Sequence, residues 1–133
     1  MIPIPTNGET WLICGGRDFA DREMFHSAMT YLVKTRGCPA KVVHGAARGA
    51  DALADAWGYT MAVPVERVPA DWKANGRAAG PIRNQKMLDE HKPTVVIAFP
   101  GGRGTADMVA RSKKLSEIVV IEIKLKMEGS DAN

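Results

Sequence analysis

The sequence predicts a single α/β domain in which a mostly parallel sheet of about five strands carries helices on both faces. Short, continuously apolar segments alternate with longer segments whose apolar residues recur at helical spacing. Continuously apolar strands are typical of parallel sheets, because helices cover both faces of such a sheet. The length of 133 residues suits one domain, and a content of 45% hydrophobic and 25% charged residues is typical of a globular protein.

The first strand is predicted over residues 10–14, where apolar and β-favouring residues end at Gly15 and Gly16. The helix after it begins at Asp21, which can cap it, and ends before Gly37. The apolar residues of this helix fall on one face. They are Met24, Phe25, Ala28, Met29, Leu32 and Val33.

The middle of the chain repeats this order of strand, loop and helix. Residues 41–44 form a second predicted strand, which Gly45 ends, and a helix follows to about Tyr59. A third strand is predicted over residues 63–68. Residues 69–81 contain two prolines, two glycines and Trp72, a composition that predicts an irregular segment long enough to act as a lid.

The last third of the chain predicts a helix over residues 82–90, a very apolar strand over 94–99, a helix over 105–115 and a strand over 118–123. Residues 1–123 therefore form the predicted domain, which is Rossmann-like. The polar residues 124–133 are expected to be a frayed tail.

Glycine and arginine recur in the loops after three of the strands. The loops are Gly15-Gly16-Arg17, Gly45-Ala46-Ala47-Arg48-Gly49-Ala50-Asp51 and Pro100-Gly101-Gly102-Arg103-Gly104-Thr105. The carboxyl ends of parallel strands meet at one edge of a sheet, so these loops are expected to converge. Glycine lets backbone N–H groups approach an anion, and arginine offers a forked donor for phosphate. The pattern predicts a phosphate-binding edge, although neither the dinucleotide fingerprint nor a P-loop is present.

Each candidate side chain also has a structural interpretation. Arg17, Arg48 and Arg103 follow glycines, and at least two of them are expected to contact phosphate. Asp51 lies in the first turn of its helix, where it either complements the helix dipole or bonds a ribose hydroxyl. Thr105 is expected to be an N-cap whose hydroxyl can also face a phosphate.

Further candidates lie outside these loops. Trp72 is expected to stack on a base or close the pocket, with packing against the sheet as the alternative. Arg83 and Asn84 open the next helix and can reach the same ligand, whereas His44 is interpreted as structural, with no partner identified. The predicted ligand-binding residues are Gly15, Gly16, Arg17, Gly45, Ala46, Arg48, Asp51, Trp72, Arg83, Asn84, Gly101, Gly102, Arg103, Gly104 and Thr105.

Five segments together resemble a known family. They are Gly-Gly-Arg-Asp-Phe at 15–19, His-Gly-Ala-Ala-Arg-Gly-Ala-Asp at 44–51, Asp71-Trp72, Ala79-Gly80 with Arg83-Asn84 and Met87, and Phe-Pro-Gly-Gly-Arg-Gly-Thr-Ala-Asp-Met at 99–108. This combination resembles the YspA-like branch of the SLOG superfamily, which also contains the LOG phosphoribohydrolases, the lysine decarboxylase-like proteins and Smf/DprA. The resemblance implies a Rossmann-like fold, a pocket for a nucleotide derivative, a bacterial or phage source and a homo-oligomer built through helices.

One position departs from the catalytic LOG pattern. LOG enzymes are expected to carry Pro-Gly-Gly-x-Gly-Thr-x-x-Glu, whose glutamate takes part in cleaving an N-glycosidic bond. Met108 occupies the glutamate position here, and Asp107 is the neighbouring acid. One residue along a helix rotates a side chain by about 100°. Asp107 is therefore not expected to replace the glutamate.

Three functions are compatible with these features. A non-catalytic protein that senses or sequesters an ADP-ribose-like or cyclic nucleotide is favoured. The alternative is a nucleotide N-glycosidase or phosphoribohydrolase that uses Asp107, Asp51 or Asp71 as acid or nucleophile. Single-stranded DNA binding, as in Smf/DprA, ranks last because aromatic residues make up only 6% of the chain.

Composition adds expectations about the protein's surroundings. Cys14 and Cys38 match neither a metal knuckle nor a redox pair, so reduced thiols, no metal and no cofactor are expected. The sequence contains no signal-peptide pattern and no apolar run as long as the ~20 residues that span a membrane. These features predict a cytoplasmic protein without a membrane partner. The net charge of +3 is dispersed along the chain and suits a phosphate ligand better than nucleic acid.

Overall fold

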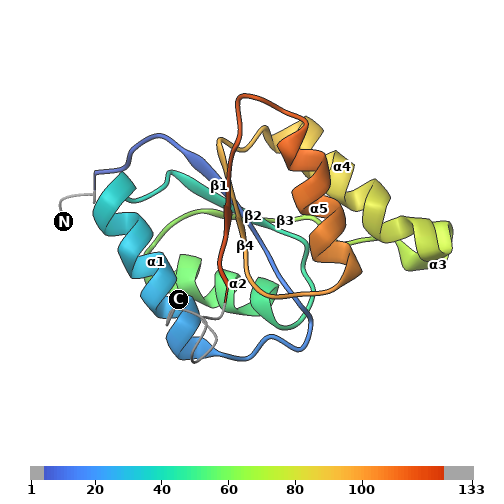
Figure 1. Ribbon diagram of the computed structural model, residues 1–133, viewed down its shortest axis with the longest axis horizontal. Helices are drawn as coiled ribbons and strands as arrows, with labels where there is room; N and C mark the ends of the chain where they lie inside the picture. Colours follow the sequence, from blue (N-terminus) through green and yellow to red (C-terminus); the bar gives the residue numbers. More distant parts are fainter. Residues whose placement is uncertain (1–4, 125–133) are drawn as a thin grey trace, which may run out of the picture.

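The computed structural model describes residues 5–124 and contains a five-stranded parallel sheet in the order β3-β2-β1-β4-β5 (Figure 1). The strands are β1 (Thr10–Cys14), β2 (Lys41–His44), β3 (Val65–Arg67), β4 (Val95–Ala98) and β5 (Val119–Glu122). The helices are α1 (Arg22–Arg36), α2 (Ala50–Thr60), α3 (Trp72–Asn75), α4 (Ala79–His91) and α5 (Arg103–Lys113), with a 3₁₀ turn, η1 (Gly76–Ala78), between α3 and α4. The predicted fold class is confirmed.

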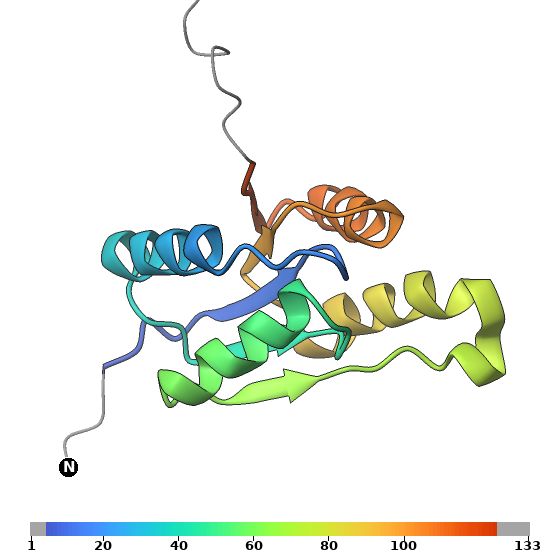
Figure 2. The ribbon, with the colours of Figure 1, turned by 90° about the horizontal axis from the view of Figure 1, so that it is seen from below.

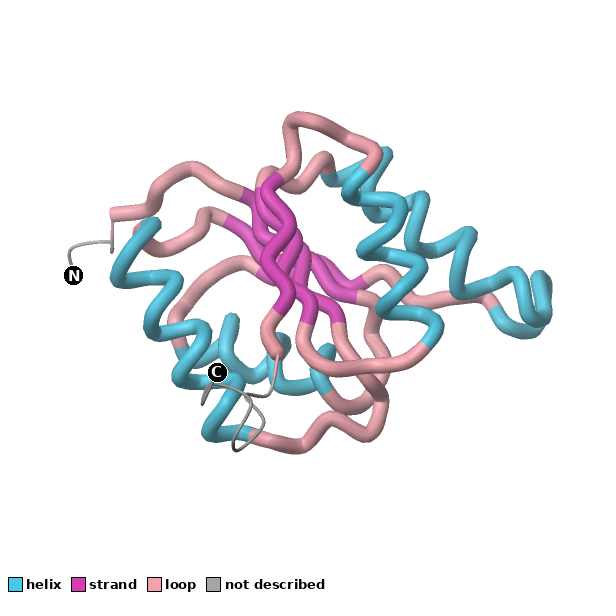
Figure 3. Tube along the Cα trace, in the orientation of Figure 1, coloured by secondary structure: helices cyan, strands magenta, loops and turns pink. Residues whose placement is uncertain are grey.

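Helices cover both faces of the sheet, as its apolar strands require. Successive residues of the central strand β1 point to opposite faces. Trp11 and Ile13 pack with α1 and α2, whereas Leu12 and Cys14 pack with α4 and α5. Figure 1 and Figure 3 show the sheet between these two helical layers. The result is a buried core on each side of β1, which holds the carboxyl ends of β1, β2 and β4 in place.

Helix α1 begins and ends at the residues that the sequence predicts. The Asp21 carboxylate accepts a hydrogen bond from the Met24 N–H at 2.9 Å, as predicted for an N-cap. Gly37 ends the helix with a φ of 93°, and its N–H donates to the Val33 carbonyl. The predicted strands and helices are found in order, with ends shifted by one to three residues at several positions.

The prediction of an irregular segment over residues 69–81 holds for residues 69–71 and is wrong from residue 72 onward. Asp71 caps α3 by accepting from the Ala74 N–H at 3.0 Å, and η1 joins α3 directly to α4. Pro81 lies in the first turn of α4, where its missing N–H has no intrahelical partner to lose. Helices α3 and η1 extend beyond α4 at one end of the molecule (Figure 2). The predicted frayed tail, apart from Lys124, lies outside the described residues.

Within residues 5–124, no helix combines the length and the apolar character that crossing a membrane would require.

Candidate functional site

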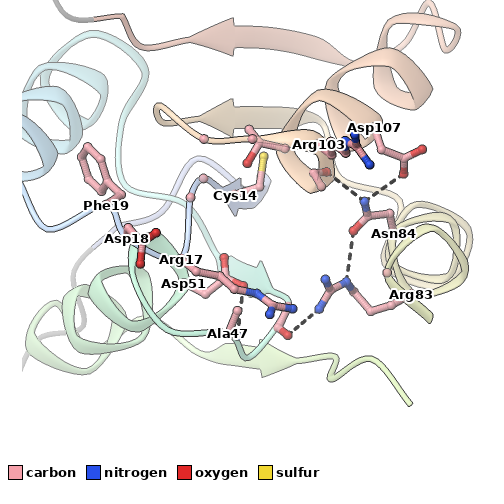
Figure 4. Close-up of a pocket in the computed structure, with 18 of the residues that line it drawn as sticks. Cys14, Arg17, Asp18, Phe19, Ala47, Asp51, Arg83, Asn84, Arg103 and Asp107 are labelled. Carbon is pink, nitrogen blue, oxygen red and sulfur yellow. Dashed lines mark hydrogen bonds between the residues drawn. The ribbon is translucent and has the colours of Figure 1, made fainter. Parts of the chain in front are cut away.

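The loops after β1, β2 and β4 meet around a cleft of about 980 Å³ at the carboxyl edge of the sheet (Figure 4). Helix α4 and the segment before it form the remaining wall. This volume lies within the range of small-molecule sites. All of the predicted ligand-binding residues line the cleft except Ala46 and Arg48, which line a smaller adjoining cavity of about 370 Å³.

Gly16 joins the three loops through its backbone. Its N–H donates to the Pro100 carbonyl at 2.9 Å, and its carbonyl accepts from the Ala50 N–H at 3.2 Å. The approach is so close that a side chain at Gly101 would lie 2.6 Å from the Gly16 nitrogen. Gly49 has a φ of 76°, and a side chain there would collide with the backbone of Gly16 and Arg17. Glycine at these two positions is therefore a condition for the loops to pack together.

Helix α5 begins two residues earlier than the sequence predicts. Gly102 is its N-cap and Arg103 its first residue, so the prediction that Thr105 caps the helix is wrong. Arg103 and Gly104 adopt helical backbone angles, which places Thr105 in the first turn with its side chain against Gly101. The free N–H groups of this turn and the Arg103 side chain lie at the cleft.

Arg17 lies over Trp72 at the cleft. Its guanidinium carbon is 5.0 Å from the centre of the Trp72 ring, within the range of a cation–π interaction. Trp72 belongs to α3 and not to a loop, and its ring also lies against Gly80 of α4. The ring therefore orients an arginine, a contact that the sequence did not reveal. Stacking of Trp72 on a base stays a prediction.

Arg48 differs from Arg17 and Arg103. Its guanidinium is 3.1 Å from the Asp18 carboxylate in an exposed ion pair, and it does not line the main cleft. Two of the three predicted phosphate-binding arginines therefore face the cleft, and Arg48 lines the smaller adjoining cavity.

Arg83 and Asn84 connect the walls of the cleft through hydrogen bonds (Figure 4). Arg83 Nη1 donates to the Gly45 carbonyl at 2.6 Å, and Arg83 Nε donates to Asn84 Oδ1 at 3.0 Å. Asn84 Nδ2 in turn donates to the Gly104 carbonyl at 3.2 Å and to Asp107 Oδ2 at 3.0 Å. The network ties the loop after β2 to the start of α5, so both residues organise the cleft as well as line it.

Asp107 is the acid of α5 that lines the cleft. Burial alone would raise the pKa of its carboxyl, but hydrogen bonds from Arg111 (2.8 Å) and Asn84 outweigh burial and lower the pKa. Asp107 is therefore an ionised carboxylate at neutral pH, with one oxygen already accepting two hydrogen bonds. A group in this state is a poor proton donor.

Asp51 lies in the first turn of α2, as predicted, and is 6% exposed. Its carboxylate accepts a hydrogen bond from the Ala47 N–H at 3.2 Å. Burial raises the pKa of Asp51, and the N–H of Ala47 acts in the opposite direction. The carboxylate holds the loop after β2 in shape. Asp71, the third candidate acid, caps α3 and is not part of the cleft lining.

His44 has the partner that sequence reasoning did not identify. Its Nδ1 accepts from the Ala46 N–H at 2.9 Å, so its Nε2 carries the proton and donates to Asp55 at 2.8 Å. Arg67 holds the other side of the Asp55 carboxylate. The structural interpretation of His44 fits this geometry, because the imidazole is buried and bonded at both nitrogens.

Replacing Asp55 by asparagine is expected to lower the free energy of unfolding at pH 7 by about 1–2 kcal/mol, because the buried His44 loses a charged partner. Hydrogen bonds from Arg67 and His44 lower the pKa of Asp55 in the fold. Its stabilising effect is therefore complete above the unfolded pKa near ~4 and is lost as the pH falls through the folded pKa.

Urea denaturation at several pH values tests this expectation. The asparagine variant should lose less stability than the natural chain on acidification below about pH 4. Asp18→Asn, which removes the carboxylate of a largely exposed ion pair, should leave stability unchanged. If the free energy of unfolding depended on pH in the same way for the Asp55 variant and the natural chain, the Asp55 carboxylate would not contribute to stability.

Comparisons with known proteins agree with this architecture. The model of the YspA, cpYpsA-related SLOG family matches residues 12–74. The gene 61 protein of Mycobacterium phage D29 is 36% identical over 110 residues, which cover 77% of this chain and 87% of the phage protein. The chain belongs to the YspA, cpYpsA-related SLOG family. No solved structure matches it.

In this SLOG chain the residue at the LOG glutamate position does not line the cleft. Met108 is fully buried in the core between the sheet and helices α4 and α5. The thiol of Cys14 borders the cleft, and burial raises its pKa to about 12, so it is not an activated nucleophile. Neither residue offers the chemistry of bond cleavage.

The predicted ligand-binding residues leave out several residues of the SLOG cleft. They are Cys14, Asp18, Phe19, Ala20, Ala47, Arg77, Gly80, Pro81, Met87 and Pro100. Cys14 and residues 18–20 flank the first glycine loop, and Ala47 and Pro100 belong to the second and third, so the loops themselves were the available signal. Arg77 lies in the segment wrongly predicted to be irregular, five residues after Trp72.

Proposed function

We propose that this protein binds a nucleotide or nucleotide-derived signalling ligand, ADP-ribose-like or cyclic, and leaves it chemically intact. The observation that carries the proposal is the convergence of three glycine loops on one cleft that Arg17 and Arg103 also line. Backbone N–H groups, a helix start and guanidinium groups together form the donor set that phosphate requires. Membership of a SLOG family, which suggests a nucleotide-related function, supports it.

The state of the acidic residues supports binding without hydrolysis. Asp107 is ionised and engaged by Arg111, and Asp51 is buried and engaged by the loop backbone. N-glycosidic cleavage needs an acid or a nucleophile free to act on the bond. A sensor or a sequestering protein is therefore favoured over a phosphoribohydrolase, and the similarity to a phage protein suits a phage-encoded source.

Replacing Arg103 by glutamine is expected to weaken ligand binding by roughly 10- to 100-fold, because a charge-assisted hydrogen bond to phosphate is lost. The measurement is calorimetry with mononucleotides, ADP-ribose, NAD and cyclic signalling nucleotides, followed by chromatography of the recovered ligand. Lys34→Gln is the control: it removes one exposed positive charge in the last turn of α1, from a residue that does not line the cleft.

Intact ligand in every sample supports the proposed binder. Accumulation of a free base or a ribose phosphate, lost in Asp107→Asn, would instead establish an N-glycosidase. Equal affinity of the Arg103 and Lys34 variants would show that Arg103 and the cleft it lines do not bind the ligand.

A further inference from the structure

Positive charge exceeds negative charge along the cleft. Four arginines and three aspartates belong to its lining. Two of the aspartates, Asp18 and Asp107, are neutralised by Arg48 and Arg111, which lie outside that lining. The four lining arginines are Arg17, Arg77, Arg83 and Arg103, and among the described residues none of them has a carboxylate within ion-pair distance. One singly charged anion would leave most of this charge unbalanced.

Two of these arginines face each other. Figure 4 shows the guanidinium groups of Arg17 and Arg83 directed toward one another beside Ala47. Burial lowers the pKa of Arg83, the charge of Asp51 opposes this shift, and the like charge of Arg17 adds to it. Arg17 is held at this place by the Trp72 ring. Two guanidinium groups kept this close repel each other, and an anion between them would relieve the repulsion.

Arg83 also has N–H groups for which the described residues provide no acceptor. A guanidinium carries five N–H groups, and in the described part of the chain only the Gly45 carbonyl and Asn84 Oδ1 accept from Arg83. Its remaining N–H groups are free for a ligand. We call this place, defined by Arg17 and Arg83, the paired-arginine position.

A second cluster of donors belongs to a different wall. Arg103 and the free N–H groups at the start of α5 come from the loop after β4. Figure 4 shows Arg103 on the α5 side with Asp107, apart from Arg17 and Arg83. We call this place, defined by Gly101, Gly102 and Arg103, the α5 position.

We propose that the cleft holds anions at both positions and selects a ligand with two phosphate groups over the corresponding monophosphate. This inference rests on the proposed function and narrows its ligand class. Nucleoside diphosphates, ADP-ribose and cyclic dinucleotides share the required chemistry, and a cleft of about 980 Å³ has the volume for them.

Calorimetry with two matched series tests the inference. One series contains AMP, ADP, ADP-ribose and cyclic di-AMP, and the other contains GMP, GDP and cyclic di-GMP. The natural chain should bind at least one two-phosphate ligand about tenfold or more tightly than the monophosphate of the same base. Arg83→Gln and Arg17→Gln should reduce this ratio toward one, and Lys34→Gln, which removes an exposed charge in the last turn of α1, should preserve it.

The variants separate the possible outcomes. Arg17 is exposed, so Arg17→Gln tests the paired-arginine position even if the half-buried Arg83 proves necessary for folding. Equal affinity for monophosphates and all two-phosphate ligands would overturn the inference and leave the proposed function standing. If neither Arg17→Gln nor Arg83→Gln changed the ratio of the two affinities, the inference would likewise be overturned and the proposed function would stand. If no nucleotide of either series binds, the proposed function itself fails.

Discussion

Replacing Gly49 by alanine is expected to lower the free energy of unfolding by about 3 kcal/mol. Gly49 has a φ of 76° and a ψ of −126°, a backbone conformation that side chains rarely adopt. A methyl group there would also meet the carbonyl groups of Gly16 and Arg17, which are backbone atoms that cannot rotate away. Strain and collision therefore add at the point where the loops after β1 and β2 meet.

Gly76→Ala separates the cost of backbone strain from the cost of the collision. Gly76 has a similar backbone conformation, with φ 53° and ψ −133°, but a side chain there would meet no atom within 4 Å. This control is expected to cost about 1–2 kcal/mol, from backbone strain alone. Urea denaturation of both variants measures the difference. If both substitutions cost the same, the close approach of Gly49 to the loop after β1 does not contribute to stability.

Replacing Gly101 by alanine is expected to weaken ligand binding by roughly 30-fold or more, because backbone donors to the phosphate are displaced. A side chain at Gly101 would collide with Thr105 and approach the Gly16 nitrogen to 2.6 Å. That nitrogen holds the Pro100 carbonyl at 2.9 Å. The loops after β1 and β4 must therefore separate to admit the methyl group, and the phosphate-binding edge opens with them.

Gly104→Ala is the matched control for this prediction. Gly104 belongs to the same loop and the same cleft, but a side chain there would meet no atom within 4 Å. Because Gly104 lies in α5, alanine should stabilise the protein by about 0.5–1 kcal/mol. Calorimetry and urea denaturation of both variants give the comparison. Undiminished binding by the Gly101 variant would contradict the role assigned to the contact between the loops.

The order of strands and helices, and the convergence of the glycine loops, could be predicted from the sequence. Apolar periodicity is a local property, so residues 10–14 and the face of α1 that contains Phe25 and Met29 could be read directly. Once the strands are parallel, geometry alone brings the loops after β1, β2 and β4 to one edge. The segment over residues 69–81 was misread because Pro81 marks the first turn of a helix as well as a loop.

The sequence by itself determined the α/β class, the order of the elements and the edge at which the glycine loops meet, because these follow from local periodicity and from the rules of parallel sheets. Only the tertiary structure decided where each side chain points. It pairs His44 with Asp55, directs Arg48 to Asp18 and places Arg17 over Trp72. These contacts join residues 11, 30 and 55 positions apart in the chain, and such partners depend on how separate elements pack, which no local pattern records.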